Sequence, residues 1–304
     1  MNQFDIASAT GLAKLNVRIW EPERRPKAVL QIVHGMAEHI DRYDEFAGFF
    51  TQNGILVVGA DIAGHGKSIA ENGVKGYFGE SDGWGALVGD IRSVHLNIKK
   101  IYDDIPYFLF GHSMGSFLAR TYAARHADDM DGFIFCGTAG NNPSVPIAKL
   151  IARYEIKKNG PTAQSPLLDN LSFGSFNKAF RPNRTEFDWL SVNEENVDKY
   201  LADENCGYVF TAGGFRDLFS GLGEIGAKDW PDRVAKKPIL LIAGMDDPVG
   251  ANGKGPAQVA KRLAAAGRDV TLKLYPGMRH EIHNENGREQ VYRDILSFIE
   301  KHLA

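Results

Sequence analysis

Short apolar segments alternate with longer segments of helical periodicity along most of this chain, and this order limits its fold more than any other feature. Four apolar segments have the character of buried strands: VLQIVHG (residues 29–35), GILVVGAD (54–61), GFIFCGT (132–138) and PILLIAG (238–244). Strands that alternate with helices join through right-handed crossovers and form a mostly parallel sheet. Strands that are apolar throughout are typical of a sheet covered on both faces. We therefore predict an α/β fold with a mostly parallel central sheet flanked by helices.

The remaining segments extend this pattern. LNVRIWEP (residues 15–22) alternates as a half-buried strand does, another strand is expected to start at Tyr107, and VTLKLYPG (270–277) supplies one more near the C-terminus. The helices are expected over about residues 42–54, 82–102, 116–126, 256–266 and 287–302.

Residues 139–235 interrupt the rhythm, because no core strand is recognisable there. The segment combines loop signals such as GNNPSVP with helical patches that are rich in aromatic residues. A structureless loop of this length is implausible in a compact domain. We predict that residues 139–235 form a helical insertion over one edge of the sheet, and that residues 1–138 and 236–304 form the core. Most of the aromatic side chains are expected to pack inside the insertion, and a few to line a pocket that faces the sheet.

The composition excludes several classes of function. The 304 residues carry a net charge of −3, which gives no large electrostatic footprint for nucleic acid. No apolar run approaches the roughly 18 residues of a transmembrane helix, and the first residues lack the basic and apolar regions of a signal peptide. Cys136 and Cys206 are too few for a disulfide framework and lack the spacing of a zinc site, so we expect two buried, reduced thiols. We expect a cytoplasmic protein with no transmembrane segment and no nucleic-acid partner.

The segment GHSMG carries the strongest chemical signal. Gly111-x-Ser113-x-Gly115 follows a buried strand and precedes a helical pattern, which is the context that a nucleophile elbow requires. The alternative is an ordinary tight turn that happens to contain a serine. In an elbow, the Ser113 hydroxyl stands above the carboxyl edge of the sheet, and the amide of Met114 points at the developing oxyanion.

A nucleophilic serine needs a base, and the base needs an acid that orients it. Asp246 and Asp247 follow the strand at residues 238–244, and His280 follows the next strand along the chain. The order Ser, Asp, His on successive loops at the carboxyl ends of strands is the order of the elbow enzymes. Position alone leaves Asp246 and Asp247 as alternatives. His280 is preferred to His283, which lies farther beyond the turn.

A second oxyanion donor is expected on the loop HGMAEH, which follows the strand at residues 29–35. Gly35 lets the backbone approach closely, and the amide of Met36 is the candidate donor.

Two other segments resemble known binding motifs but do not match them. DIAGHGKS has Asp61 where a phosphate-binding loop needs its first glycine, and HEIH at residues 280–283 is one residue short of the zinc motif HExxH. We therefore expect neither a cofactor nor a metal.

The chain resembles the monoacylglycerol lipase and lysophospholipase branch of the α/β-hydrolases, which is also grouped with the serine aminopeptidase S33-like hydrolases. The segments that carry the resemblance are HGMAEHIDRY, ADIAGHGKS, GHSMGS, LLIAGMDDPV and YPGMRHEIHNE. The family pattern of a glycine, two residues and the catalytic aspartate implies Asp247, and the HG-x pattern implies Met36 as an oxyanion donor. The insertion corresponds to the family's cap. Ser116 departs from the pattern, because the family usually has a second glycine there, and the cap offers no match to a substrate-binding group.

Together these features predict a serine hydrolase that cleaves carboxylic esters through Ser113, His280 and Asp247 and an acyl-enzyme. The resemblance implies an acylglycerol or lysolipid substrate and is compatible with transient contact with a membrane surface. The alternatives are a short-chain carboxylesterase, a serine aminopeptidase and a non-catalytic binding scaffold. An aminopeptidase would need a carboxylate in the cap to hold the substrate amine, and the available candidates are Glu186, Glu194 and Glu195.

Overall fold

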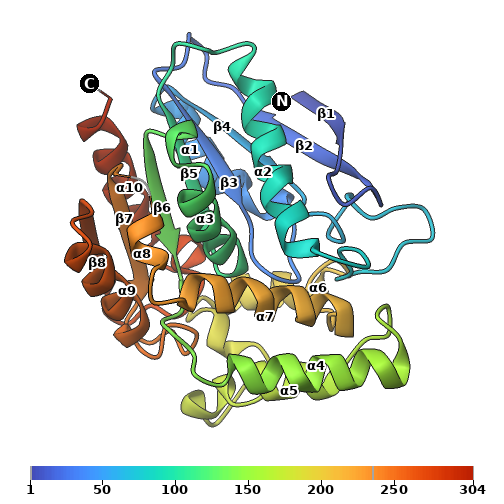
Figure 1. Cartoon of the computed structure of the whole chain (residues 1–304). Coiled ribbons are helices and arrows are strands. Elements are labelled where there is room, and N and C mark those ends of the chain that lie inside the picture. The colour runs from blue at the N-terminus through green and yellow to red at the C-terminus, as the bar shows by residue number, and fades with distance from the viewer. Residues whose placement is uncertain (1, 235, 304) are drawn as a thin grey trace.

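A computed structural model describes residues 2–234 and 236–303. The strands in this part of the chain are β1 (Asn2–Ala7), β2 (Lys14–Trp20), β3 (Ala28–Val33), β4 (Ile55–Ala60), β5 (Tyr107–His112), β6 (Gly132–Cys136), β7 (Ile239–Gly244) and β8 (Val270–Tyr275). They form one sheet in the order β1-β2-β4-β3-β5-β6-β7-β8 (Figure 1). All neighbours from β4 to β8 in this order are parallel, and β2 runs antiparallel to both β1 and β4. The predicted α/β fold is confirmed.

The helices flank this sheet. They are α1 (Asp44–Gln52), α2 (Gly83–Lys99), α3 (Met114–Arg125), α4 (Val145–Asn159), α5 (Pro166–Phe173), α6 (Glu194–Ala202), α7 (Ala212–Gly226), α8 (Trp230–Arg233), α9 (Lys254–Ala265) and α10 (Arg288–Lys301). Short 3₁₀ turns are η1 (Ile40–Tyr43), η2 (Ala127–Asp129), η3 (Phe176–Phe180), η4 (Asp188–Leu190) and η5 (Ile282–Asn284). Within the described ranges, none of the helices has both the length and the apolar character needed to cross a membrane.

Alternate side chains of the central strands point into two hydrophobic clusters, one on each face of the sheet. In β3, Val29 and Val33 belong to the cluster covered by α2 and α3, whereas Leu30 and Ile32 belong to the cluster covered by α1 and α10. Every residue of β3 is buried as a result. Coverage of both faces explains why the strand is apolar without alternation.

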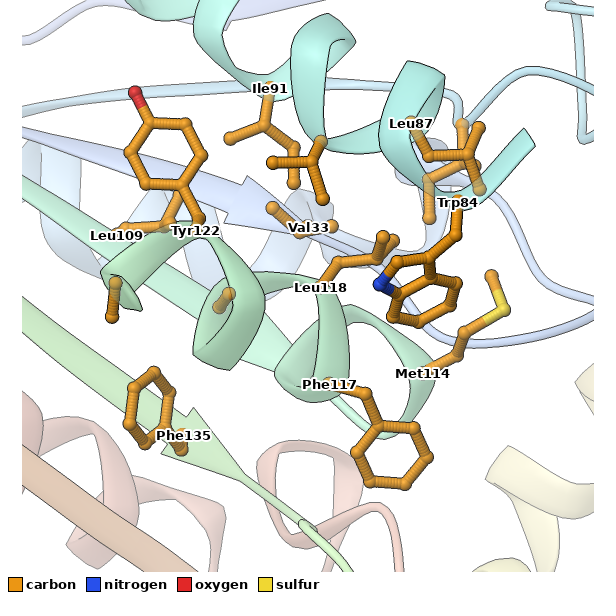
Figure 2. Packing of buried hydrophobic residues seen from close by; sticks show 14 of the residues in the cluster. Val33, Trp84, Leu87, Ile91, Leu109, Met114, Phe117, Leu118, Tyr122 and Phe135 are labelled. Atoms are coloured by element: carbon orange, nitrogen blue, oxygen red, sulfur yellow. The ribbon is translucent and has the colours of Figure 1, made fainter. Parts of the chain in front are cut away.

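Helix α3, which follows Ser113, is fixed on the sheet by its packing against α2. Figure 2 shows Trp84 of α2 beside Met114 and Leu118 of α3. The Trp84 indole N–H also donates a hydrogen bond to the Thr121 hydroxyl at 3.1 Å. These contacts hold the N-terminus of α3, and with it the serine, at a defined height above the sheet.

The insertion forms helices α4 to α8 between β6 and β7. Figure 1 shows α4, α5 and α7 lying across the end of the sheet to which the parallel strands point. Helices α7 and α8 also contribute Phe215 and Trp230 to the cluster on the α2 and α3 face. Gly221 of α7 lies so close to Trp84 that a Cβ there would overlap the indole ring. Residues 1, 235 and 304, at which limits of the predicted core and insertion fall, lie outside the described residues.

The sequence analysis did not predict β1, which pairs with β2 at the edge of the sheet. From Gln3 to Ala7 the side chains alternate between exposed and partly buried, and Phe4 and Ile6 pack against the core. The predicted strand at residues 15–22 is β2. Cys136 and Cys206 are free and buried, as expected.

Candidate active site

Ser113 occupies the sharp turn between β5 and α3, with φ of 53° and ψ of −120°. Such a conformation costs a residue with a side chain about 1–3 kcal/mol and persists only where its surroundings impose it. The flanking glycines make this possible. A Cβ on Gly111 would overlap the carbonyl of Gly115, and a Cβ on Gly115 would overlap the carbonyl oxygens of Val33 and His34. The strand and the helix therefore approach more closely than any side chain at these two positions would permit.

Ser116 stabilises the same turn through two hydrogen bonds to the backbone of Ser113. Its hydroxyl donates a hydrogen bond to the carbonyl oxygen of Ser113 at 2.6 Å, and its amide donates to the same oxygen at 2.8 Å. The side chain is fully buried. The residue that departs from the family pattern thus binds the backbone of the candidate nucleophile.

Asp247 and His280 form a buried pair. The Nδ1 atom of His280 lies 3.0 Å from Oδ1 of Asp247, and the same carboxylate oxygen accepts the amide of Val249 at 2.8 Å. Because Oδ1 can only accept, the pairing favours the tautomer that carries its proton on Nδ1 and leaves Nε2 as the base. The other oxygen, Oδ2, has no hydrogen-bond partner among the described residues.

The pKa of His280 is raised above its ordinary value of 6.5, as the balance of opposing influences. Burial favours the neutral ring and lowers the pKa. The charge of Asp247 and its hydrogen bond, followed by the charges of Glu281 and Glu38, favour the imidazolium and outweigh burial. The site therefore stabilises the cation that forms when the ring takes a proton.

Asp246 and His283, the alternatives to Asp247 and His280 in the sequence analysis, do not form the Asp–His pair. Asp246 is exposed, and Asp247 beside it is the residue that contacts the imidazole. His283 is fully buried and stacks on Tyr43 with ring centroids 5.0 Å apart. Burial and the nearby ring of His112 lower the pKa of His283 to about 3, so this ring stays neutral.

Ser113, His280, Met36 and Met114 all line one cavity, which lies between the carboxyl edge of the sheet and the insertion. A Cβ built on Gly35, the residue before Met36, would lie 3.3 Å from Cβ of Ser113. The loop that carries Met36 therefore passes close to the serine. Four of the five candidate residues therefore lie at one cavity, and Asp247 is hydrogen-bonded to His280, one of these four.

The cavity has a volume of about 1060 Å³ and extends from Ser113 under the insertion. Its apolar wall includes side chains of α4, α5 and α7, among them Ile147, Leu171 and Phe219. Aromatic side chains of the insertion contribute as expected, among them Phe173, Phe176, Phe187, Trp189, Tyr200 and Tyr208.

Of the three glutamates considered for amine binding, one lines the cavity and two do not. Glu186 lines the cavity. Glu194 and Glu195 stand on the exposed side of α6, where Glu195 pairs with Lys199 at 2.7 Å. Glu186 is therefore the one of the three that a bound substrate could reach.

Three charged residues beside the site were not predicted from the sequence: Glu38 and Glu281, which are buried, and Arg42, whose side chain is 10% exposed. A signal for two of them was present. Glu38 and Arg42 stand four residues apart in HGMAEHIDRY, which is a spacing at which opposite charges can pair. Charged residues are almost never buried unless they are paired, and burying them costs hydration.

Two clusters within the described ranges group side chains that could act as metal ligands: His112, Cys136 and His283, and His39, Asp203 and Cys206. In the second cluster His39 already pairs with Asp203 at 2.7 Å. Burial raises the pKa of the Cys206 thiol above its ordinary value, so the thiol holds its proton. Neither cluster includes Ser113 or His280.

The comparisons with known proteins agree with this geometry. A model of the family described as "Serine aminopeptidase, S33" matches residues 24–287. Human monoglyceride lipase is 30% identical over 294 residues, which cover 94% of this chain and 87% of that protein. The monoacylglycerol lipase of Mycolicibacterium smegmatis is 28% identical over 301 residues, which cover 97% and 96%. A highly thermostable carboxyl esterase from Bacillus coagulans matches with a TM-score of 0.94 at 30% identity, covering 100% of this chain and 99% of that one.

Proposed function

Because the chain belongs to the α/β-hydrolase family described as serine aminopeptidase, S33, and is similar to monoacylglycerol lipases along nearly its whole length, we propose that it is a serine hydrolase of carboxylic esters. The observation that carries the proposal is the buried pair of Asp247 and His280 in the same cavity as the strained Ser113. A strained backbone at a cavity wall has no structural benefit of its own.

In the proposed mechanism, the Ser113 oxygen attacks the acyl carbon while His280 removes the hydroxyl proton. Asp247 holds the imidazole in the required tautomer and stabilises its positive charge. The backbone amides of Met36 and Met114 bind the oxyanion, and each such donor typically lowers the barrier by about 2.7–4 kcal/mol. His280 then protonates the departing alcohol, and water, activated by the same ring, releases the acid and regenerates the serine.

For the substrate we propose an ester with a single long acyl chain, such as a monoacylglycerol or a lysolipid. The relatives named as monoacylglycerol lipases and the apolar wall of the cavity support this choice. Each methylene buried there would contribute about 0.8 kcal/mol. Residues 139–235 would act as the cap that shields the acyl chain from water.

The catalytic assignment is tested with the variant Ser113→Ala. It should retain its fold and lose both turnover of p-nitrophenyl esters and labelling by a fluorophosphonate probe. Ser93→Ala, on α2 and away from the cavity, is the matched control and should behave as the wild type. Turnover or labelling that survives in Ser113→Ala would refute the assignment, and a wild-type protein that does not react with the probe would indicate a non-catalytic scaffold.

The acyl-chain preference is tested with p-nitrophenyl esters of two to sixteen carbons and with intact monoacylglycerols and lysophospholipids. We expect kcat/KM to rise with chain length until the cavity is filled. A maximum at acetate or butyrate would replace the lipase proposal with a short-chain carboxylesterase.

An aminopeptidase is the second candidate, because Glu186 lines the cavity. A carboxylate there could pair with the free amine of a peptide substrate. Hydrolysis of an amino acid p-nitroanilide that is lost in Glu186→Gln, with ester hydrolysis retained, would favour this activity. We expect no such hydrolysis.

A further inference from the structure

A buried guanidinium joins two of the loops that meet at the candidate active site. One nitrogen of Arg42, Nη1, donates to Oε2 of Glu38 at 2.7 Å and to Oε1 of Glu281 at 2.8 Å. The other, Nη2, donates to Oε2 of Glu281 at 2.7 Å. The Arg42 side chain is 10% exposed and both glutamate side chains are 2% exposed. Arg42 therefore binds Glu281 in the bidentate manner that fixes direction as well as distance.

Glu38 connects this guanidinium to the oxyanion loop, which we define as residues 34–37. Its second oxygen, Oε1, accepts the amide of Gly35 at 2.5 Å and the hydroxyl of Tyr43 at 3.2 Å. Gly35 directly precedes Met36, the proposed oxyanion donor. Burial would raise the pKa of Glu38, but the charge of Arg42 and a hydrogen bond with His112 hold it well below its ordinary value. The carboxylate that binds the loop is therefore ionised.

Glu281 connects the same guanidinium to the candidate base, because it directly follows His280. Its amide donates to the carbonyl of Leu190 at 2.8 Å, and its Oε2 accepts the side-chain amide of Asn196 at 2.7 Å. Burial raises the pKa of Glu281, but Arg42 outweighs burial and lowers it to about 2. Residues of the insertion therefore hold Glu281 from the side opposite to the sheet.

We infer that Arg42 and Glu281 are positioning residues, which fix His280 and the oxyanion loop relative to each other through the chain Glu281–Arg42–Glu38–Gly35. The inference rests on the proposed function, because it assigns this role to the reaction of Ser113. None of these groups reacts with the substrate. Each acts by holding a neighbour that does.

Stability alone does not account for this arrangement. Two buried carboxylates and a buried guanidinium lose much hydration, and apolar side chains of equal volume often stabilise a protein as well. What apolar side chains cannot do is fix the orientation of a peptide group and of a loop by directed hydrogen bonds. A displacement of about 1 Å in an active site can lower the rate about 100-fold, so directed contacts of this kind have a catalytic consequence.

The charge of Glu281 also acts directly on His280, as one of several groups that face the imidazole. Asp247 and Glu38 are the other anions, and the ring of His112 lies with its centroid 4.7 Å from that of His280. Removal of the Glu281 charge should therefore make the His280 cation less stable. A merely structural residue would not have this effect.

The primary test is the variant Glu281→Gln. It keeps an oxygen that accepts hydrogen bonds and leaves Arg42 paired with Glu38, so no buried charge loses its partner. Per site titrated with a fluorophosphonate, we expect kcat for p-nitrophenyl butyrate to fall about tenfold with KM changed less than about twofold. We expect the acidic limb of the pH profile, and the imidazole titration of His280 followed by NMR, to move to lower pH.

Two further variants define the role of Arg42. Arg42→Gln should lower kcat more than Glu281→Gln, and Arg42→Lys, which keeps the charge but loses the fork, should recover part of that loss. Glu195→Gln is the matched control. It removes one carboxylate from an exposed ion pair on α6 and should leave kcat and the His280 titration unchanged.

The inference is overturned if folded Glu281→Gln, compared per titrated site, has the wild-type kcat and the wild-type His280 titration. It is also overturned if the loss of activity equals the loss of titratable sites, since that outcome reports only unfolding. Failure of the proposed function is a distinct result. A wild-type protein that does not react at Ser113 would refute the proposed function, and the NMR titration of His280 would then still decide whether Glu281 acts on the ring.

Discussion

At the scale of single residues, the elevated pKa of His280 has a kinetic consequence. The ring must be neutral to accept the serine proton, so kcat/KM should increase with pH as the imidazolium deprotonates and then reach a plateau. Because the pKa is raised, we expect the midpoint of this increase above 6.5. A pH–rate profile between about pH 5 and 9 measures it.

Asp247→Asn provides the control for this profile. The substitution removes the anion with the largest effect on His280 and permits the wrong tautomer, so we expect kcat to fall about 10⁴-fold. A wild-type midpoint below 6.5, or a folded Asp247→Asn variant of nearly full activity, would contradict this account of the pair.

Ser116 allows a second test at this scale. Ser116→Gly restores the residue that the family usually has, but it removes the hydrogen bond to Ser113 and places glycine in the first turn of α3. We expect a loss of about 1–2 kcal/mol in the free energy of unfolding, measured with urea. Ser116→Ala separates the two contributions, because it removes the hydrogen bond and keeps a good helix former. Equal stability of Ser116→Gly and the wild type would show that the hydroxyl contributes nothing.

The candidate catalytic residues could be predicted from the sequence because each of them follows the end of a strand. Ser113, Asp247 and His280 each stand on a loop that follows a strand of the parallel sheet, so their proximity could be predicted from strand order. Arg42 and Glu281 could not be paired in this way, because 239 positions separate them and no periodic pattern links them. Their contact depends on where two loops end in space, and local patterns do not encode it.

At the scale of elements, Asp90 joins α2 to the hairpin of β1 and β2. Its two oxygens accept the Ser8 hydroxyl at 2.7 Å and the Ala9 amide at 2.6 Å. Burial raises the pKa of Asp90 to about 6 despite these hydrogen bonds. The folded protein therefore binds a proton more tightly than the unfolded chain does, and stability should decrease as the pH rises from about 4 to about 6.

We expect Asp90→Asn to remove this dependence, because an amide does not ionise. Its oxygen can still accept the Ala9 amide, and its NH2 group can donate to the Ser8 hydroxyl in place of the hydrogen bond that the carboxylate accepts. The difference in unfolding free energy between variant and wild type should grow across this pH range, toward about 3 kcal/mol in favour of the variant at pH 7. Urea unfolding of both proteins at pH 4, 5, 6 and 7 measures it. A difference that does not depend on pH would show that Asp90 is not buried as a weak acid.

Strand β1 is a secondary-structure element that could not be predicted from this sequence. The central strand β3 is buried on both faces and is apolar throughout, so its pattern is unmistakable. In β1, only Asp5 separates Phe4 from Ile6, and this pair of apolar residues is too short a pattern to predict a strand. The strand forms through its register with β2. Such a strand is stabilised by its partner rather than by its own composition, which is why the sequence analysis passed over it.

At the scale of the whole molecule, Arg120 and Trp230 join both ends of the insertion to the core. Arg120, buried on α3, donates to the carbonyl of Ala139 at 2.8 Å and to that of Ile225 at 3.4 Å. The Trp230 indole N–H donates to the Arg120 carbonyl at 3.1 Å, and the Arg120 guanidinium lies 4.5 Å from the centre of the indole ring. Arg262 of α9 also binds the Ile225 carbonyl. The first and last parts of the insertion thus share one anchor.

We expect Arg120→Met to lower the free energy of unfolding by about 2–4 kcal/mol, because it removes the donor to the Ala139 carbonyl and the contact of the guanidinium with the Trp230 ring. Limited proteolysis should also cleave faster between residues 139 and 145. Arg125→Met, one turn farther along α3, breaks an exposed ion pair with Glu224 and should cost less than about 1 kcal/mol. Equal effects of the two substitutions would refute the anchoring role.

The overall architecture was largely predictable, because alternating strands and helices permit few topologies. The attachment of the insertion was not. The sequence analysis expected most of its aromatic residues to pack among themselves, yet Phe210 and Phe215 are buried in the cluster that covers the sheet. Gly221 packs against Trp84 because glycine has no Cβ, and a hydrophobic pattern in the sequence does not reveal such a contact.

The depth of the cavity bears on what limits turnover. An acid released from Ser113 would start at the base of a space of about 1060 Å³ and would have to leave past the same apolar wall that favoured binding of the chain. Each methylene that tightens the Michaelis complex would then also lengthen the residence time of the product. The rate at low substrate concentration would increase with chain length while the saturated rate declines, so the preferred ester would depend on how much of it is present.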